Sequence, residues 1–276
     1  MAHLAATNAH SVCIKRLTSH QNKLICRHTC PLMNQSDTQL ASNLIKPLQV
    51  QGFAFVPAPN VRALLPVTAL NTWSSFAASW HHLGLDTYMA DGGRYRRRRF
   101  NAYAVSEEGI QCKPPQPHYQ SRDYNALNGG IERWFQPFAD EIAMHPCLLA
   151  LLELGYSVFN GLTPLVHRPK QWHVECHQFR IEAREGDLGQ PTPEGLHRDG
   201  VDWVLVLLVN RENIAEGVTR IHDAHRHLVG SFTLINSLDA AFVDDARVYH
   251  GVTPVSVINP SLPAFRDVLV MTFRRE

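Results

Sequence analysis

The pattern of apolar residues changes near residue 170, from helical spacing before it to short strands after it. Residues 60–83 and 130–157 carry apolar side chains at helical spacing, with Pro66 interrupting the first stretch early. After residue 170 the apolar runs are short, rich in Val, Ile, Phe and Trp, and separated by Gly, Pro and Asn. We predict strands at 172–184, 201–209, 217–222, 230–235, 240–250 and 266–274. Helices followed by a run of strands favour an α+β chain with an antiparallel sandwich or barrel.

The composition is that of an ordinary globular protein. The 276 residues carry a formal net charge of +1, with 45% hydrophobic and 18% charged residues. This length suits one domain with a sizeable core. No apolar run approaches the roughly 20 residues that a membrane-spanning helix needs. Because the charge is nearly balanced, we expect neither nucleic acid nor a membrane as a partner.

The first 32 residues differ from the rest of the chain. They have no helical or strand period, so we expect a disordered leader at 1–32 and a single domain at 33–276. The fold signal begins directly after Met33, which makes that residue an alternative start of translation. Five potential zinc ligands lie in the leader, namely Cys13, His20, Cys26, His28 and Cys30. Their spacing matches no common structural zinc pattern.

Cysteine usage indicates a reducing compartment. Six cysteines in a chain of this length are too few for a disulfide scaffold. Basic residues, including Lys15 and Arg16, interrupt the apolar stretches near the N-terminus, so we expect no secretory signal. We therefore predict a cytoplasmic protein.

Three residues have the chemistry and the spacing of a metal site. His197 and Asp199 lie directly before an apolar strand, and residues i and i+2 of an extended segment point to the same face. His250 ends another apolar run and precedes Gly251, at a strand-to-turn position. Two His and one carboxylate on one face of an octahedron leave three sites open, as in non-haem Fe(II) oxygenases. A zinc hydrolase with one open site is the competing interpretation.

Arg266 favours the iron interpretation. It begins the last apolar strand, and an arginine that points inward from a core strand needs an anion, which its planar fork binds best as a carboxylate. A dicarboxylate cosubstrate that chelates iron at one end needs such a partner at the other. The sequence therefore predicts Fe(II) at His197, Asp199 and His250. It predicts a dicarboxylate cosubstrate bound through Arg266.

Four further residues are candidates for contacts with the cosubstrate or the substrate. Gln178 and Arg180 share one face of the strand before the metal motif, so Gln178 could donate to the cosubstrate and Arg180 to the substrate. A surface pair is the alternative. Trp203 points to the same face as Asp199 if the strand has no bulge, because the two lie four residues apart. It would then line the pocket, and the alternative is a tryptophan of the core. Glu194 could meet an amino group of the substrate.

The strongest charge run covers residues 94–99, of which five are arginine. Such a run is typical of a solvated face or of a nucleic-acid surface. Tyr95 interrupts the run and Phe100 ends it, and the chain as a whole is not basic. We therefore expect one or two of these arginines, Arg98 among them, to face the anionic pocket.

Five segments together resemble the bacterial 2-oxoglutarate–Fe(II) dioxygenases of the L-isoleucine dioxygenase type. These segments lie at residues 92–100, 176–181, 193–202, 245–254 and 266–269. The resemblance extends from about residue 45 to the C-terminus. It implies a double-stranded β-helix, a cupin-like jelly roll, with flanking N-terminal helices. It matches the iron ligands to the three metal-motif residues and the 2-oxoglutarate partner to Arg266.

The resemblance also implies the reaction. It would be the hydroxylation of an aliphatic C–H bond of a free, isoleucine-like L-amino acid, with O2 and 2-oxoglutarate as cosubstrates, succinate and CO2 as products, and ascorbate in a supporting role. Two alternatives stay open. One is the same chemistry on a peptide or another small metabolite, and the other is a cupin-like metal-binding protein without turnover. Arg266 favours an enzyme, because a simple metal binder needs no carboxylate partner.

Overall fold

The computed structural model describes residues 44–276. The predictions for the leader, for Met33 and for the five potential zinc ligands lie outside this range. The chain is helical over residues 44–51 and then forms β1 (Phe53–Val56), α2 (Ala58–Leu64), α3 (Val67–Leu70), α4 (Trp73–Ala78) and the 3-10 helix η1 (Ser79–His82). The helical prediction for 60–83 is confirmed, and Pro66 separates α2 from α3.

The middle of the chain differs in part from the expectation. It forms β2 (Gly84–Leu85), β3 (Arg96–Ser106), β4 (Gly109–Cys112), α5 (Asp140–Ala143), α6 (Pro146–Leu162) and the 3-10 helix η2 (Leu165–His167). The helix predicted over 130–157 is wrong for its first ten residues, which are irregular. Gly129 and Gly130 disfavour helix there, and Arg133 pairs with His118 in an isolated antiparallel bridge.

The run of strands predicted after residue 170 is confirmed. It consists of β5 (Trp172–Glu182), β6 (Trp203–Glu212), β7 (Ile214–Glu216), β8 (Thr219–His222), β9 (Leu228–Phe232), β10 (Ala240–Asp244), β11 (Tyr249–Val252), β12 (Val255–Val257) and β13 (Phe265–Arg275). Valine, isoleucine and aromatic residues suit the pleated, half-buried surface of such strands.

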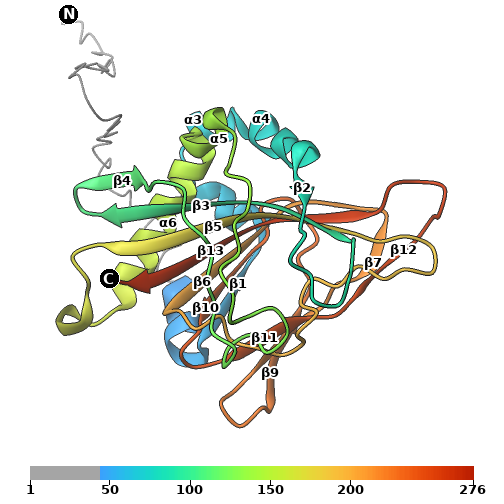
Figure 1. Cartoon of the computed structure of the whole chain (residues 1–276). Helices are drawn as coiled ribbons and strands as arrows, with labels where there is room; N and C mark the ends of the chain where they lie inside the picture. Colours follow the sequence, from blue (N-terminus) through green and yellow to red (C-terminus); the bar gives the residue numbers. More distant parts are fainter. Residues whose placement is uncertain (1–43) are drawn as a thin grey trace, which may run out of the picture.

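The strands form one large sheet and two smaller ones, all antiparallel. The large sheet has the order β1-β10-β6-β13-β5-β3-β2, with β4 on β3, and the smaller sheets have the orders β11-β8-β9 and β12-β7. In Figure 1 the smaller sheets lie to the lower right of the large sheet, and the helices lie on its other side. The fold is a jelly-roll core with flanking helices, as predicted.

Alternation along each strand assigns its side chains to one of two layers. In β6, Leu205 and Leu207 belong to the main apolar core with α6, whereas Val204 and Val206 line a cavity. Gly155 of α6 permits the close approach of the helix, since a Cβ atom there would lie 2.6 Å from the ring of Phe273. The cavity therefore lies on the face of the sheet that the helices leave open.

The segment Asp140–Leu162 has the length and the apolar composition of a membrane-spanning helix. In this fold, 56% of its apolar window is buried inside the molecule. Leu148, Leu151 and Leu152 are fully buried in the main apolar core. Its apolar composition is therefore that of a helix packed against a sheet.

Candidate metal centre

The three predicted ligands lie together in the cavity. His197 and His250 form an isolated antiparallel pair, in which each backbone N–H donates to the carbonyl of the other at 3.0 and 2.9 Å. Asp199 reaches both rings: its Oδ1 lies 3.7 Å from Nε2 of His197, and its Oδ2 lies 3.3 Å from Nε2 of His250. One ligand atom from each residue lies within 4.8 Å of the others. A single ion can bridge such a set.

Asp245 holds the segment that carries Asp199. Its carboxylate accepts the backbone N–H groups of Asp199, Gly200 and Val201 at 2.9, 2.8 and 3.1 Å. The chain turns at Gly200 with a φ of 80°, a conformation that favours glycine. Sequence analysis missed Asp245, whose signal was a pair of acidic residues at the end of an apolar strand. An acidic side chain at that place needs several donors to stay ionised when buried.

The charges of the site favour a bound cation. Burial by itself would lower the pKa of His197, but its hydrogen bond and charge interaction with Asp199, together with Glu194, raise that pKa to about 9. Burial would raise the pKa of Asp199, but the imidazoles of His197 and His250 hold it well below its usual range. A divalent cation can take the place of the proton between these groups. Two imidazoles and one carboxylate are the donor set that suits Fe(II).

Arg266 lines the same cavity as the three predicted metal ligands. It is 3% exposed, and its Nε and one Nη are buried without a hydrogen-bond partner. Burial and the neighbouring Arg211 lower its pKa to about 10. The adjacent Asp267 is engaged by Arg180 through two hydrogen bonds of 2.7 Å. A buried guanidinium without a partner is costly, so the position of Arg266 fits a carboxylate bound in the cavity.

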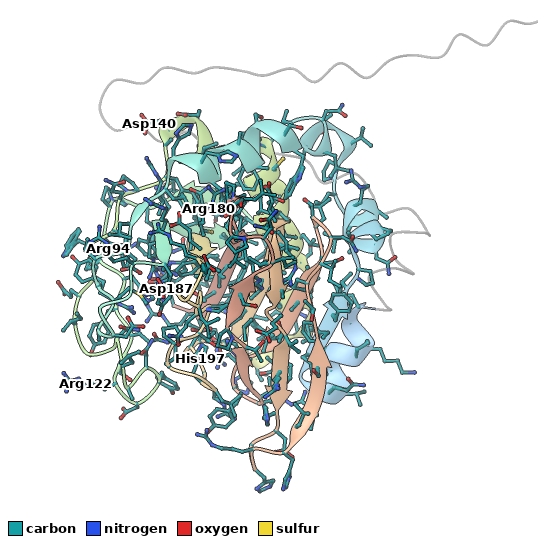
Figure 2. All side chains as sticks on the ribbon, turned by 90° about the vertical axis from the view of Figure 1, so that its right-hand side faces the viewer. Arg94, Arg122, Asp140, Arg180, Asp187 and His197 are labelled. Carbon is teal, nitrogen blue, oxygen red and sulfur yellow. The ribbon has the colours of Figure 1, made fainter. Side chains whose placement is uncertain are left out.

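Gln178 and Arg180 do not reach the cavity. The odd-numbered residues of β5 from 173 to 181 line it, so the even-numbered side chains point away. The amide of Gln178 donates to Oγ of Ser79 at 2.8 Å, and Arg180 is paired with Asp267. In Figure 2, Arg180 lies near the helices and His197 well below it. The expectation that these two residues contact the cosubstrate and the substrate is therefore wrong.

Trp203 also points away from the cavity. Its ring stacks on that of Phe159 at 5.3 Å, and its Nε1 donates to Oγ1 of Thr163 at 3.2 Å. The chain bends between Gly200 and the start of β6, so Trp203 and Asp199 no longer point to the same face. Of the two alternatives weighed for Trp203, the structure favours the core.

Glu194 lies beside the predicted metal ligands and lines the cavity. One carboxylate oxygen lies 3.4 Å from Nε2 of His197, and the other is buried without a hydrogen-bond partner. The structure therefore leaves Glu194 available for a donor group of a bound molecule.

The arginine run divides between the two faces of β3. Arg97 pairs with Glu182 at 2.6 Å and Arg99 donates to backbone carbonyls, whereas Arg96 and Arg98 line the cavity. Arg98 is 4% exposed, and its guanidinium lies 3.6 Å from the ring centre of Phe135. Two arginines of the run, including Arg98, thus face the pocket.

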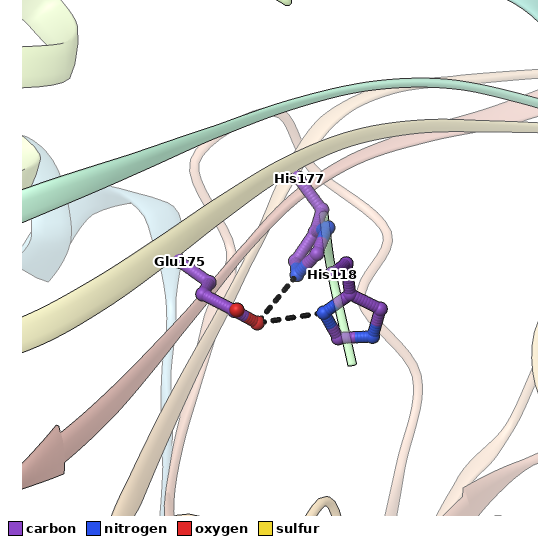
Figure 3. Close-up of side chains that lie close together, drawn as sticks. All are labelled: His118, Glu175 and His177. Carbon is purple, nitrogen blue, oxygen red and sulfur yellow. Dashed lines mark hydrogen bonds and ion pairs between the residues drawn. The ribbon is translucent and has the colours of Figure 1, made fainter. Parts of the chain in front are cut away.

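A second group of two imidazoles and one carboxylate lies in the cavity wall, and Figure 3 shows its members, His118, Glu175 and His177. One oxygen of Glu175 lies 2.7 Å from Nδ1 of His118 and 3.7 Å from Nε2 of His177. Burial would raise the pKa of Glu175, but these imidazoles hold it well below its usual range. Sequence analysis missed this group, although Glu175 and His177 share one face of a predicted strand.

The chain matches known proteins over most of its length. Residues 77–272 match a family model described as 2OG-Fe dioxygenase. An L-isoleucine-4-hydroxylase from Bacillus thuringiensis is 26% identical over 194 residues, which cover 68% of this chain and 80% of that protein. A 3(1)-hydroxy-L-isoleucine 4-dioxygenase from Pantoea ananatis is 24% identical over 247 residues, which cover 83% and 94%. The crystal structure of a bsmA homolog from Methylobium petroleophilum shares 34% identity with a TM-score of 0.75, covering 85% and 93%.

Proposed function

Since the chain belongs to the 2OG-Fe dioxygenase family, we propose that it hydroxylates an aliphatic C–H bond of a free, isoleucine-like L-amino acid. The family implies Fe(II), with 2-oxoglutarate and O2 as cosubstrates. Membership of the family is shown, and the identity of the substrate is what we propose. It draws support from the two curated relatives, whose names give isoleucine or a hydroxylated isoleucine as the substrate.

The buried guanidinium of Arg266, in the same cavity as the metal motif, is the main support for assigning oxygenase chemistry to this site. A metal-binding protein without a cosubstrate would leave this charge without a partner. With 2-oxoglutarate bound, Arg266 would meet the carboxylate that does not chelate the metal. We therefore assign the metal to His197, Asp199 and His250, and the far carboxylate to Arg266.

The cavity suits two small molecules better than a peptide. Its volume is about 330 Å³, at the lower end of the range for small-molecule sites. Val204, Val206 and Val270 contribute apolar walls that exclude water from the reacting carbon. Bound iron and 2-oxoglutarate would supply the oxidising chemistry, with succinate and CO2 released and one oxygen atom of O2 entering the substrate. The chain's own residues would position the cosubstrate and select the carbon that is oxidised.

The test is succinate formation from 2-oxoglutarate under air, with Fe(II), across the twenty L-amino acids. We include ascorbate because we propose that it keeps the iron reduced. Succinate that rises with one or a few aliphatic amino acids, together with a product heavier by one oxygen atom, would support the function. Succinate without any dependence on amino acid would move the substrate to another small molecule. No succinate from iron-loaded protein would contradict the function.

A further inference from the structure

Arg133 is a second buried guanidinium in the cavity that has no carboxylate partner. It is 2% exposed and its Nε has no hydrogen-bond partner. Within residues 44–276 no carboxylate forms an ion pair with it, although Asp86, Glu194 and Glu175 act on it from farther away. Burial without a paired charge is costly, so this position calls for an anion from outside the chain.

2-Oxoglutarate does not supply this anion under the proposed function. Of its two carboxylates, one joins the keto group at the metal and the other is assigned to Arg266. A carboxylate at Arg133 must therefore belong to a second molecule in the same cavity. An amino-acid substrate brings one such group.

His118 lies directly opposite Arg133. The two residues form an antiparallel bridge in which each backbone N–H donates to the other's carbonyl, at 3.0 and 2.9 Å. Opposite residues in such a pair project their side chains to one side, with Cβ atoms about 5 Å apart. Both side chains line the cavity. The carboxylate and the ammonium of an α-amino acid share one carbon atom, so their receptors must be neighbours, as these two residues are.

His118 presents an acceptor to the cavity. Its Nδ1 lies 2.7 Å from a carboxylate oxygen of Glu175, which can only accept, so the ring proton lies on Nδ1. Burial lowers the pKa of His118 despite the neighbouring Glu175. In the neutral ring the lone pair is therefore on Nε2. An imidazole lone pair with a carboxylate behind it suits an ammonium group.

A second metal ion is the rival use of His118, Glu175 and His177. One Nη of Arg98 lies 2.6 Å from Nδ1 of His177, and a guanidinium can only donate. Burial lowers the pKa of His177 to about 3, so the ring is neutral and its one proton lies on Nε2, toward Glu175. A protonated nitrogen has no lone pair for a metal. The group therefore fits hydrogen bonding better than metal binding.

We propose that Arg133 binds the α-carboxylate of the substrate and that His118, backed by Glu175, binds its α-ammonium. This assignment rests on the proposed function and sharpens it, because an ammonium and a carboxylate on the same carbon atom are the mark of a free α-amino acid. A residue within a peptide chain offers neither of them. The pair of receptors would thus restrict the enzyme to free amino acids.

Calorimetric titration under nitrogen tests the assignment without turnover, on protein loaded with Fe(II) and 2-oxoglutarate. The probes are L-isoleucine, 3-methylpentanoic acid, which lacks the amino group, and 2-methylbutylamine, which lacks the carboxylate. We expect Arg133→Gln to weaken binding of L-isoleucine and of the acid about 30-fold or more, as for a buried charge that loses its partner, and to leave the amine unchanged. His118→Phe and Glu175→Gln should weaken L-isoleucine and the amine, and leave the acid unchanged.

The matched controls are Arg97→Gln and Glu182→Gln, which remove the same groups from the ion pair that lies away from the cavity. They should bind all three probes like the wild type, and all variants should retain 2-oxoglutarate binding. A purely structural role would weaken the three probes alike and overturn the assignment. If the variants of Arg133, His118 and Glu175 bound L-isoleucine like the wild type, the receptor assignment would be overturned and the proposed function would stand. Wild-type protein that binds 2-oxoglutarate but not L-isoleucine would overturn the proposed substrate as well.

Discussion

The carboxylate of Asp245 accepts the backbone N–H of Asp199 at 2.9 Å, and so joins two segments that each carry a proposed metal ligand. Its oxygen Oδ1 also lies 3.7 Å from Nδ1 of His250. Asp245 is 1% exposed, so water does not compete for these contacts. A residue outside the proposed ligand set thus fixes the Asp199 segment and lies beside one imidazole. Such supporting contacts commonly orient metal ligands.

Replacing Asp245 should therefore weaken metal binding. We expect Asp245→Asn to lower the affinity for Fe(II) by about 10- to 100-fold, because the amide presents a donor where several backbone N–H groups need an acceptor. Competition with a chelator under nitrogen measures this affinity. Asp244→Asn is the matched control, since Asp244 pairs with Arg247 at 3.8 Å and does not contact the ligands. Equal affinities in the two variants would contradict a positioning role for Asp245.

Removal of the carboxylate ligand should abolish turnover. Asp199→Ala leaves two imidazoles and no anionic ligand, so we expect loss of succinate formation and of tight Fe(II) binding. Asp202→Ala serves as the control, because Asp202 pairs with Arg275 at 2.6 Å instead of facing the metal ligands. Turnover near the wild-type rate in Asp199→Ala would refute the assignment of the metal site.

Local patterns were sufficient to predict the strands and to single out the metal motif. Spacing by two residues placed His197 and Asp199 on one face, and the chemistry of imidazole and carboxylate identified them as candidate metal ligands. The face of a strand that turns toward the cavity could not be predicted in the same way. Gln178 and Arg180 alternate with cavity-lining residues of β5. Only the packing of β5 between β3 and β13 decides which set points inward.

Arg133 and His118 escaped prediction for a different reason. Each lies in a segment without strand periodicity, and the apolar residues around Arg133 suggested a helix. The backbone hydrogen bonds that pair them join positions 15 residues apart along the chain. Such a pairing depends on tertiary context, which a local pattern does not contain.

Arg266 gives a prediction specific to the cosubstrate. Arg266→Ala should raise the dissociation constant for 2-oxoglutarate about 30-fold or more, the usual cost when a buried charge pair loses one member. Arg266→Lys should recover only part of the affinity, because an ammonium keeps the charge but not the planar fork. Arg275→Ala, at the exposed end of β13, is the control. Unchanged affinity in Arg266→Ala would mean that another residue binds the far carboxylate.

The buried imidazole of His177 should make folding stability sensitive to acid. Burial lowers the pKa of His177 to about 3, whereas histidine in an unfolded chain has a pKa near 6.5. Between these two pH values the unfolded state therefore binds a proton that the folded state does not. As the pH falls from roughly 7 to 5, this group alone should therefore lower the free energy of unfolding by about 2 kcal/mol. The lowered pKa of His118 acts in the same direction, whereas that of Glu175 matters only in stronger acid.

His177→Phe isolates this contribution, because the ring of His177 already packs near Phe100 and Phe179 at 5.0 and 5.5 Å. Urea unfolding of metal-free wild type and variant at both pH values gives the free energies of unfolding. The loss of stability on acidification should be smaller in the variant by about 2 kcal/mol. The metal must be absent, because its release in acid would add its own pH dependence. Equal losses in the two proteins would show that His177 is protonated in the folded state and would contradict its assignment as a neutral acceptor for Arg98.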